Sequence, residues 1–119
     1  MKAIVVEDDA VVSLYIKMVL KDLGHDVCAV AATVPKAISD IECHKPDFVT
    51  CDVSLAGKGS GAEVARAAYE RWGIKTLFIS ANIDSALRKE TEDLGPLGYV
   101  SKPFVTGTLA SALAFAALN

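Results

Sequence analysis

Residues 3–9 read A-I-V-V-E-D-D, a short apolar run that three acidic residues follow directly. The run has the length and the Val and Ile content of a buried strand. The next segment, 10–23, instead carries apolar residues at helical spacing. The start of the chain therefore predicts a strand, an acidic loop and a helix, in that order.

The same alternation continues to the end of the chain. Gly24, Gly73 and Gly95 follow helical segments, where C-terminal caps are expected. Pro35 suits the first turn of a helix that begins after Thr33. The pattern predicts one α/β domain over residues 1–119, with helices on both faces of a parallel sheet. The expected strands are 3–6, 27–31, 48–51, 77–79 and 99–100, and the expected helices are 10–23, 34–43, 61–72, 84–94 and 105–118.

Composition and charge exclude several classes of protein. The 119 residues are 52% hydrophobic and 23% charged, as in an ordinary globular domain. A net charge of −3 gives no basic surface for nucleic acid or for an anionic membrane. The chain shows no signal peptide, and no apolar run approaches the roughly 18 residues of a membrane span, so a cytoplasmic location is expected. Three cysteines without metal-site spacing (Cys28, Cys43 and Cys51) predict reduced thiols.

Chemically unusual residues follow four of the five expected strands. In a parallel sheet these positions meet at the carboxyl edge, where sites of such folds lie. Carboxylates that converge there would repel one another or hold a cation, and oxygen ligands suit Mg²⁺, Mn²⁺ or Ca²⁺. Each residue also has a simpler interpretation as a helix cap, a loop hydroxyl or a solvated charge, and Asp9 in particular suits a cap. Their joint placement favours a site made of Glu7, Asp8, Asp52, Ser80 and Lys102.

This group of residues predicts phosphoryl chemistry. An aspartate such as Asp52 can act as a nucleophile on phosphorus and form an aspartyl phosphate. Lys102 can pair with Asp52 at rest and with a phosphoryl oxygen afterwards, and a metal would neutralise charge on the transferring group.

Four motifs over the whole chain carry a resemblance to a known family. They are I-V-V-E-D-D at 4–9, V-T-C-D-V-S at 49–54, L-F-I-S-A at 77–81 and V-S-K-P-F at 100–104. With these motifs the chain resembles a response-regulator receiver domain of two-component signalling. The resemblance implies a doubly wound, flavodoxin-like (CheY-like) fold with strand order 2-1-3-4-5 and five helices.

The resemblance also implies roles for the site residues. Asp52 would accept a phosphoryl group from a histidine kinase or a histidine phosphotransfer protein. Lys102 would hold a phosphoryl oxygen. Ser80 would be the switch hydroxyl, Tyr99 the aromatic side chain that turns inward behind it, and Pro103 would follow a cis peptide bond.

For the metal, the resemblance implies Mg²⁺, with Mn²⁺ as a substitute. Asp8 and Asp52 would bind it directly, Glu7 through a water molecule, and Ser54 through its backbone carbonyl. The chain departs from the family pattern in having Glu7 where many members have aspartate, and the less favoured alternative, with Asp8 and Asp9 as the acidic pair, would place Glu7 inside the strand. A second departure is the glycine-rich segment 54–61, which suggests a mobile loop beside the site.

The first helix carries more apolar surface than one face can bury. Val11, Leu14 and Met18 form a second apolar stripe beside Asp8, which is either part of a wide core face or a docking patch for the helices of the phosphodonor. The docking hypothesis places Phe104 at the rim of this patch. The residues expected to face the sheet are Val12, Tyr15, Ile16, Val19 and Leu23.

The last helical segment has no charged residue from Val105 to Asn119. Its expected buried residues are Leu109, Ala112, Leu113, Ala116 and Ala117, which leaves Phe115 and Leu118 near the edge. An exposed apolar patch there could serve a homodimer or a partner protein, unless neighbouring helices or a longer chain cover it.

The leading hypothesis is a stand-alone receiver that signals through binding a downstream protein or through a phosphorelay. Such a protein catalyses only its own phosphorylation and dephosphorylation, and is no enzyme for an outside substrate. A pseudo-receiver that does not use phosphate is the first alternative. The second is an aspartyl-phosphate phosphatase, which would need an acid where Ser54 stands.

Overall fold

The computed structural model describes residues 1–55 and 59–115. Segment 56–58, in the predicted mobile loop, lies outside the described residues, as do Ala116–Asn119 and the side chain of Phe115.

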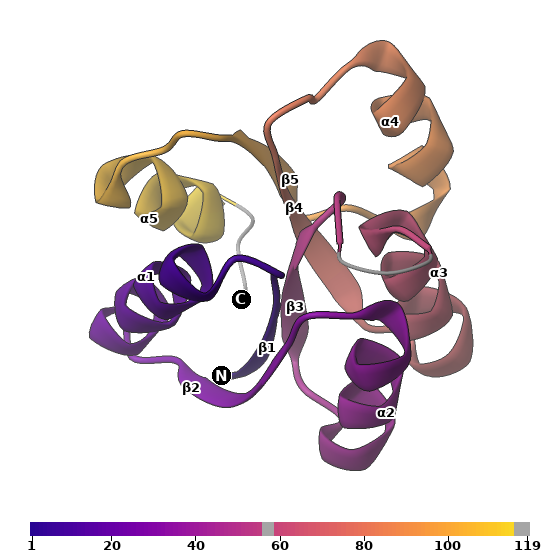
Figure 1. The fold of residues 1–119 in the computed structure, drawn as a ribbon, viewed down its shortest axis with the longest axis horizontal. Coiled ribbons are helices and arrows are strands. Elements are labelled where there is room, and N and C mark those ends of the chain that lie inside the picture. The colour runs from indigo at the N-terminus through magenta and orange to yellow at the C-terminus, as the bar shows by residue number, and fades with distance from the viewer. Residues whose placement is uncertain (56–58, 116–119) are drawn as a thin grey trace.

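Five parallel strands form one sheet in the order β2-β1-β3-β4-β5, which confirms the predicted fold (Figure 1). Strand β2 lies on one side of β1 and β3 lies on the other. The strand order in the sheet therefore changes direction at β1. Ligands of such sheets bind outside the carboxyl ends of the strands at this reversal. The strands are β1 (Lys2–Val6), β2 (Asp26–Ala31), β3 (Phe48–Asp52), β4 (Lys75–Ser80) and β5 (Gly98–Ser101).

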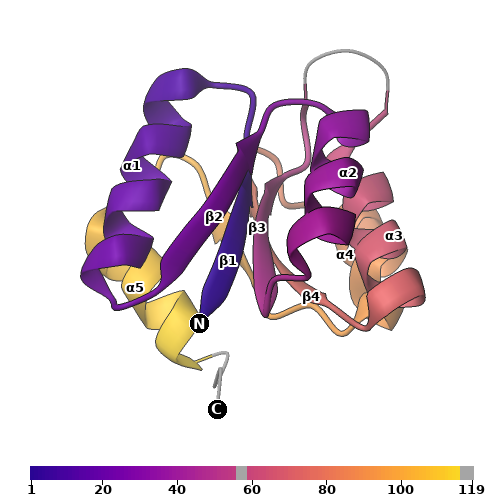
Figure 2. The same cartoon turned by 90° about the horizontal axis from the view of Figure 1, so that it is seen from below.

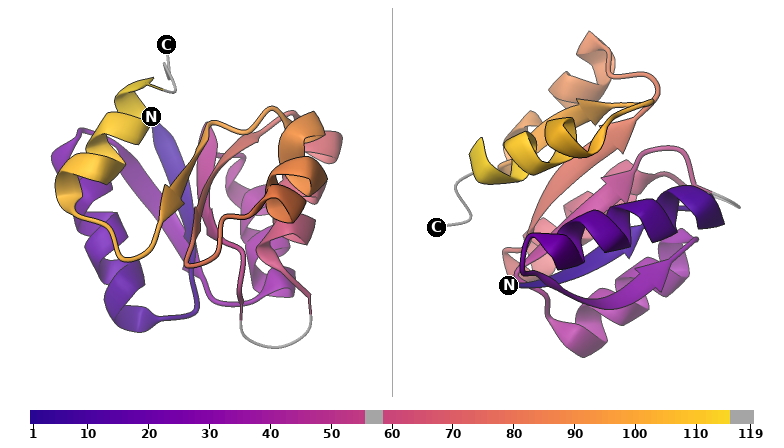
Figure 3. Two further views of the ribbon diagram at one scale, coloured as in Figure 1. Left: turned by 90° about the horizontal axis from the view of Figure 1, so that it is seen from above. Right: turned by 90° about the vertical axis from the view of Figure 1, so that its left-hand side faces the viewer.

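The helices cover both faces of the sheet. Helices α1 and α5 lie side by side on one face, and α2, α3 and α4 cover the other (Figures 2 and 3). The helices are α1 (Ala10–Asp22), α2 (Val34–His44), α3 (Gly61–Trp72), α4 (Ser85–Thr91), the short 3₁₀ helix η1 (Glu92–Leu94) and α5 (Thr106–Phe115). The predicted helix 84–94 is therefore divided into α4 and η1.

The apolar runs of the sequence are buried because β1 has a core on each side. Ala3 and Val5 pack toward α1 and α5, whereas Ile4 and Val6 pack toward α2 and α3. A strand covered on both faces needs no polar alternation, which explains its continuous apolar sequence.

Helix caps follow the predicted residue types. Thr33 Oγ1 accepts a hydrogen bond from the Lys36 amide at the start of α2. Gly73 ends α3 in the left-handed conformation, at φ 67°, which suits a residue without a Cβ.

One core assignment in α1 was wrong. The helix ends at Asp22, so Leu23 is the C-cap and its side chain is 44% exposed. Leu20, one turn earlier, is buried in its place, together with Ile16 and Val19.

The three cysteines are free thiols. Among the described residues, none of the helices has both the length and the apolar character to cross a bilayer.

Candidate functional site

Three carboxylates meet at the carboxyl edge of the sheet. Glu7 and Asp8 follow β1 directly, and Asp52 is the last residue of β3. Val6 pairs with Cys51 across these neighbouring strands, so the residues after them lie side by side. Glu7, Asp8 and Asp52 each offer one carboxylate oxygen, and these oxygens lie within 4.8 Å of one another.

The donor set fits a hard divalent cation. Glu7 and Asp52 are buried, whereas Asp8 is exposed at the mouth of the site. Neither nitrogen nor sulfur belongs to this group, and Mg²⁺ and Mn²⁺ prefer oxygen ligands.

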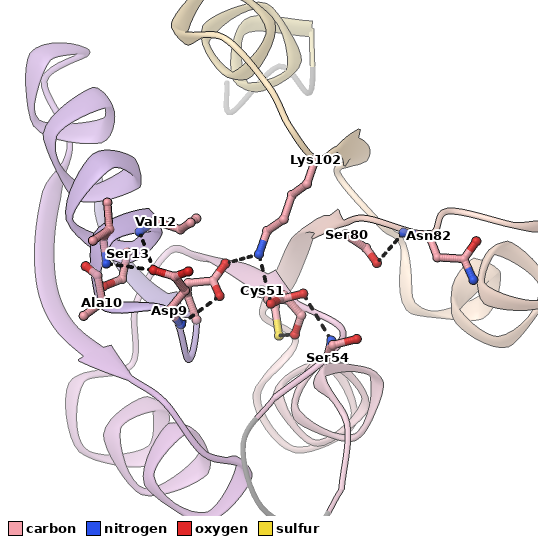
Figure 4. A network of polar contacts seen from close by, with 12 residues as sticks. Asp9, Ala10, Val12, Ser13, Cys51, Ser54, Ser80, Asn82 and Lys102 are labelled. Atoms are coloured by element: carbon pink, nitrogen blue, oxygen red, sulfur yellow. Dashed lines mark hydrogen bonds and ion pairs between the residues drawn. The ribbon is translucent and has the colours of Figure 1, made fainter.

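Lys102 reaches two of the three carboxylates from the loop after β5. Its Nζ lies 2.5 Å from Glu7 Oε1 and 3.0 Å from Asp52 Oδ2 (Figure 4). The Lys102 amide also donates to the Ser80 carbonyl oxygen at 2.9 Å, which holds the loop against β4. The sequence predicted the pair with Asp52 but not the contact with Glu7.

Burial and charge shift the pKa of the groups in this site. Burial raises the pKa of Glu7 to about 7, although hydrogen bonds from Lys102 and the Asp9 amide oppose this shift. Burial lowers the pKa of Lys102, but its hydrogen bonds to Glu7 and Asp52 outweigh that effect and the pKa is raised overall. The Lys102 ammonium thus stays charged beside Glu7 and Asp52.

Asp9 caps α1 and stays outside the carboxylate group. Its Oδ1 accepts hydrogen bonds from the amides of Val11 and Val12, at 2.9 and 3.2 Å (Figure 4). Its own amide donates to Glu7 Oε2 at 3.1 Å. The acidic pair at the site is therefore Glu7 and Asp8.

Both carboxylate oxygens of Asp52 have a hydrogen-bond donor. The Ser54 amide donates to Oδ1 at 3.1 Å, and Lys102 donates to Oδ2 (Figure 4). The carboxylate is held in one orientation at the edge of the sheet. The Ser54 side chain itself is exposed.

Ser80 ends β4 beside this site, with its hydroxyl oxygen accepting a hydrogen bond from the Asn82 amide at 3.2 Å (Figure 4). The side chain of Ser80 is buried, and within the described part of the chain its hydroxyl makes no hydrogen bond to Asp52 or Lys102.

Tyr99 lies on β5 and reaches α4. Its ring stacks on Phe78 with centroids 5.5 Å apart, and its hydroxyl oxygen is 2.6 Å from Thr91 Oγ1. The guanidinium of Arg88 lies 4.5 Å from the centre of the same ring. Sequence reasoning identified Tyr99 but missed Thr91, because no sequence pattern indicates which helix residue faces an aromatic side chain on β5.

One of the four predicted docking residues lines an apolar groove beside the site, and the other three are exposed on α1. Val11, Leu14 and Met18 are 79%, 57% and 56% exposed on α1. Phe104 is half-buried and stacks on Tyr15 at 5.6 Å. Phe104 lines a groove of about 320 Å³ together with Val12, Tyr15, Ala81, Lys102 and Pro103. The peptide bond between Lys102 and Pro103 is cis.

In α5, Leu109 and Leu113 are buried and Ala112 is half-buried, as expected. Ala116, Ala117 and Leu118 lie outside the described residues, so the homodimer remains a prediction.

The chain belongs to the response regulator receiver domain family, whose model matches residues 3–114. It is thus a receiver domain of two-component signalling, and the predicted family is confirmed.

The chain is distantly similar to two named regulators. The chain is 26% identical over 117 residues to the phyllosphere-induced regulator PhyR of Methylorubrum extorquens, covering 94% of this chain and 43% of that protein. It is 24% identical over 115 residues to the transcriptional regulatory protein PdtaR of Mycobacterium tuberculosis, covering 97% of this chain and 56% of that protein. The chain spans about half the length of these curated relatives.

Among solved structures, the receiver domain of PhyR from Erythrobacter litoralis superposes with a TM-score of 0.83 at 27% sequence identity. The match covers 98% of this chain and 88% of that one.

Proposed function

We propose that this chain is a phosphorylation-controlled switch in which Asp52 accepts a phosphoryl group from a phosphohistidine. The observation that carries the proposal is the Asp52 carboxylate itself. It is nearly buried, held by Lys102 on one oxygen and by the Ser54 amide on the other, and lies within reach of Glu7 and Asp8. A histidine kinase or a histidine phosphotransfer protein would supply the phosphoryl group.

In the transfer, a carboxylate oxygen of Asp52 attacks phosphorus. A new O–P bond forms, the N–P bond of the phosphohistidine breaks, and the imidazole nitrogen keeps the electron pair of that bond. Lys102 already contacts Asp52, so its ammonium can move to a phosphoryl oxygen and stabilise the negative charge there.

The carboxylates at the site would hold Mg²⁺, or Mn²⁺ in its place. Asp8 and Asp52 would bind it directly, Glu7 through a water molecule and Ser54 through its backbone carbonyl. A bound divalent cation supplies charge neutralisation for the transferring phosphoryl group.

Ser80 and Tyr99 are the residues proposed to respond to the phosphoryl group. Within the described residues the Ser80 hydroxyl accepts from the Asn82 amide and donates to no acceptor, so its proton is available for a phosphoryl oxygen. Tyr99 is connected to the same strand as Ser80, because its ring stacks on Phe78 of β4, and a movement at the end of β4 would reach Tyr99 through that contact. The signal would then pass to a downstream protein or along a phosphorelay.

Val11, Leu14 and Met18 form the proposed docking patch, with Phe104 at its rim. Its occupant would be a helix of the phosphodonor, because the adjoining groove is apolar and includes Lys102. Docking here would bring a phosphohistidine next to Asp52.

The experiment that tests this function is incubation with acetyl phosphate, with Mg²⁺ or with EDTA, followed by separation of phosphorylated from unmodified protein. We expect modification that requires the metal and that hydroxylamine removes, as it cleaves an acyl phosphate. Modification that is equal in EDTA, or that resists hydroxylamine, would contradict the proposal.

A further inference from the structure

Gly61, the first residue of α3, lies in direct contact with the end of β3. A methyl group placed on Gly61 would lie 2.1 Å from the Asp52 carbonyl oxygen and 2.8 Å from Cys51 Sγ. The first of these contacts is with backbone, which cannot rotate aside. Only a residue without a side chain lets α3 begin this close to the phosphoacceptor strand.

This close approach allows a backbone hydrogen bond to form. The Gly61 amide donates to the Val53 carbonyl oxygen at 2.8 Å. That carbonyl belongs to the same peptide group as the Ser54 amide, which donates to Asp52 Oδ1 at 3.1 Å. A peptide group is planar and rigid, so fixing its oxygen also fixes the direction of its N–H bond.

We propose that Gly61 is a positioning residue for phosphoryl transfer, because it holds the peptide group that orients the Asp52 carboxylate. The Gly61 amide fixes the Val53–Ser54 peptide, and that peptide fixes Oδ1 while Lys102 holds Oδ2. The inference rests on the proposed function of Asp52 and adds a residue that sequence analysis placed only at the end of the glycine-rich segment 54–61.

Cys51 also contacts Gly61, and replacing it offers a way to test the role of this close approach. Its buried thiol lies within hydrogen-bonding distance of the carbonyl oxygens of Asp52 and Gly61, at 3.3 and 3.5 Å. Replacing Cys51 with alanine removes the sulfur, and a methyl group on Gly61 could then move into the space that the sulfur leaves.

The test compares wild type with Gly61→Ala by the maximal rate of phosphorylation at saturating acetyl phosphate and Mg²⁺. Circular dichroism first establishes a temperature at which both proteins are fully folded. We expect Gly61→Ala to be roughly 10- to 100-fold slower, the range for loss of one hydrogen bond to a charged group. The amide resonance of Ser54 should shift at the same time, and a loss of stability alone would leave both readouts unchanged in folded protein.

Gly107→Ala is the matched control, because among the described residues a methyl group there meets nothing within 4 Å beyond its own helix backbone and chain neighbours. It should be phosphorylated at the wild-type rate. The double variant Cys51→Ala/Gly61→Ala should be faster than Gly61→Ala and slower than Cys51→Ala. If Gly61→Ala does not fold, the comparison of the double variant with Cys51→Ala provides the same test.

A wild-type rate for folded Gly61→Ala, or equal rates for the double variant and Cys51→Ala, would overturn the inference. Failure of wild type to be phosphorylated at all would instead overturn the proposed function of Asp52. The two failures are therefore distinguishable.

Discussion

Lys102 Nζ lies 2.5 Å from Glu7 Oε1, and this contact joins the loop after β5 to the end of β1. The Glu7 carboxylate is fully buried, whereas the Lys102 side chain retains 21% of its exposure. A buried carboxylate needs such a partner, because an unpaired charge in the interior is strongly unfavourable. The chain has glutamate at this position, and its side chain reaches the lysine directly.

Glu7 should make stability depend on pH. The folded state raises its pKa from 4.5 to about 7, so the folded protein binds this proton more tightly than the unfolded chain does. The stability that the proton provides is fully present below about pH 4.5 and is lost as pH rises to about 7. We expect the free energy of unfolding of wild type to fall relative to Glu7→Gln over this window, by a total on the order of 3 kcal/mol.

Urea unfolding of both proteins in EDTA between pH 4.5 and 8 measures this difference. Glu7→Gln keeps the size of the side chain and cannot titrate, so groups common to both proteins cancel. If the free energies of unfolding of wild type and Glu7→Gln change in parallel with pH between 4.5 and 7, Glu7 does not titrate in that window.

The strand–helix order and the group of site residues could be predicted from the sequence because both depend on local patterns. Val6 and Cys51 end apolar runs, and parallel pairing then brings Glu7 and Asp52 together without further information. The contact of Gly61 with Asp52 could not be predicted, because it depends on the path of the chain between them. For the same reason the burial of Leu20 in place of Leu23 required knowledge of where α1 ends.

Leu14→Lys should slow transfer from a phosphohistidine donor without changing the rate with acetyl phosphate. The leucine is 57% exposed in the proposed docking patch, and a charge there would disfavour an apolar helix by roughly tenfold or more in transfer rate. Leu23→Lys is the control, because Leu23 is an exposed leucine at the C-cap of α1 and lies outside the patch. Equal transfer rates for the two variants would exclude this docking site.

Thr50→Val should stabilise the protein. Thr50 is buried on β3, and within the described part of the chain its hydroxyl has no hydrogen-bond partner. Valine has nearly the same shape without the unpaired polar group, so we expect a gain of about 1 kcal/mol in the free energy of unfolding. Urea unfolding tests this, and a loss of stability would mean that the hydroxyl is hydrogen-bonded in solution.

Thr91→Val should destabilise the protein. The Thr91 hydroxyl donates to the Leu87 carbonyl oxygen at 2.9 Å, so the Tyr99 hydroxyl is the donor in the 2.6 Å contact between the two side chains. Valine removes both hydrogen bonds, and we expect the free energy of unfolding to fall by about 1 kcal/mol. Urea unfolding measures how much Tyr99→Phe lowers the free energy of unfolding in wild type and in Thr91→Val. If the two decreases are equal, the two hydroxyls do not interact.

Acceptance of a phosphoryl group by Asp52 is tested most directly by intact mass. Wild type and Asp52→Asn are incubated with acetyl phosphate and Mg²⁺, and the intact mass of each protein is measured by mass spectrometry. The account predicts a gain of one phosphoryl group, about 80 Da, in wild type only. An equal gain in Asp52→Asn, or no gain in wild type, would contradict it.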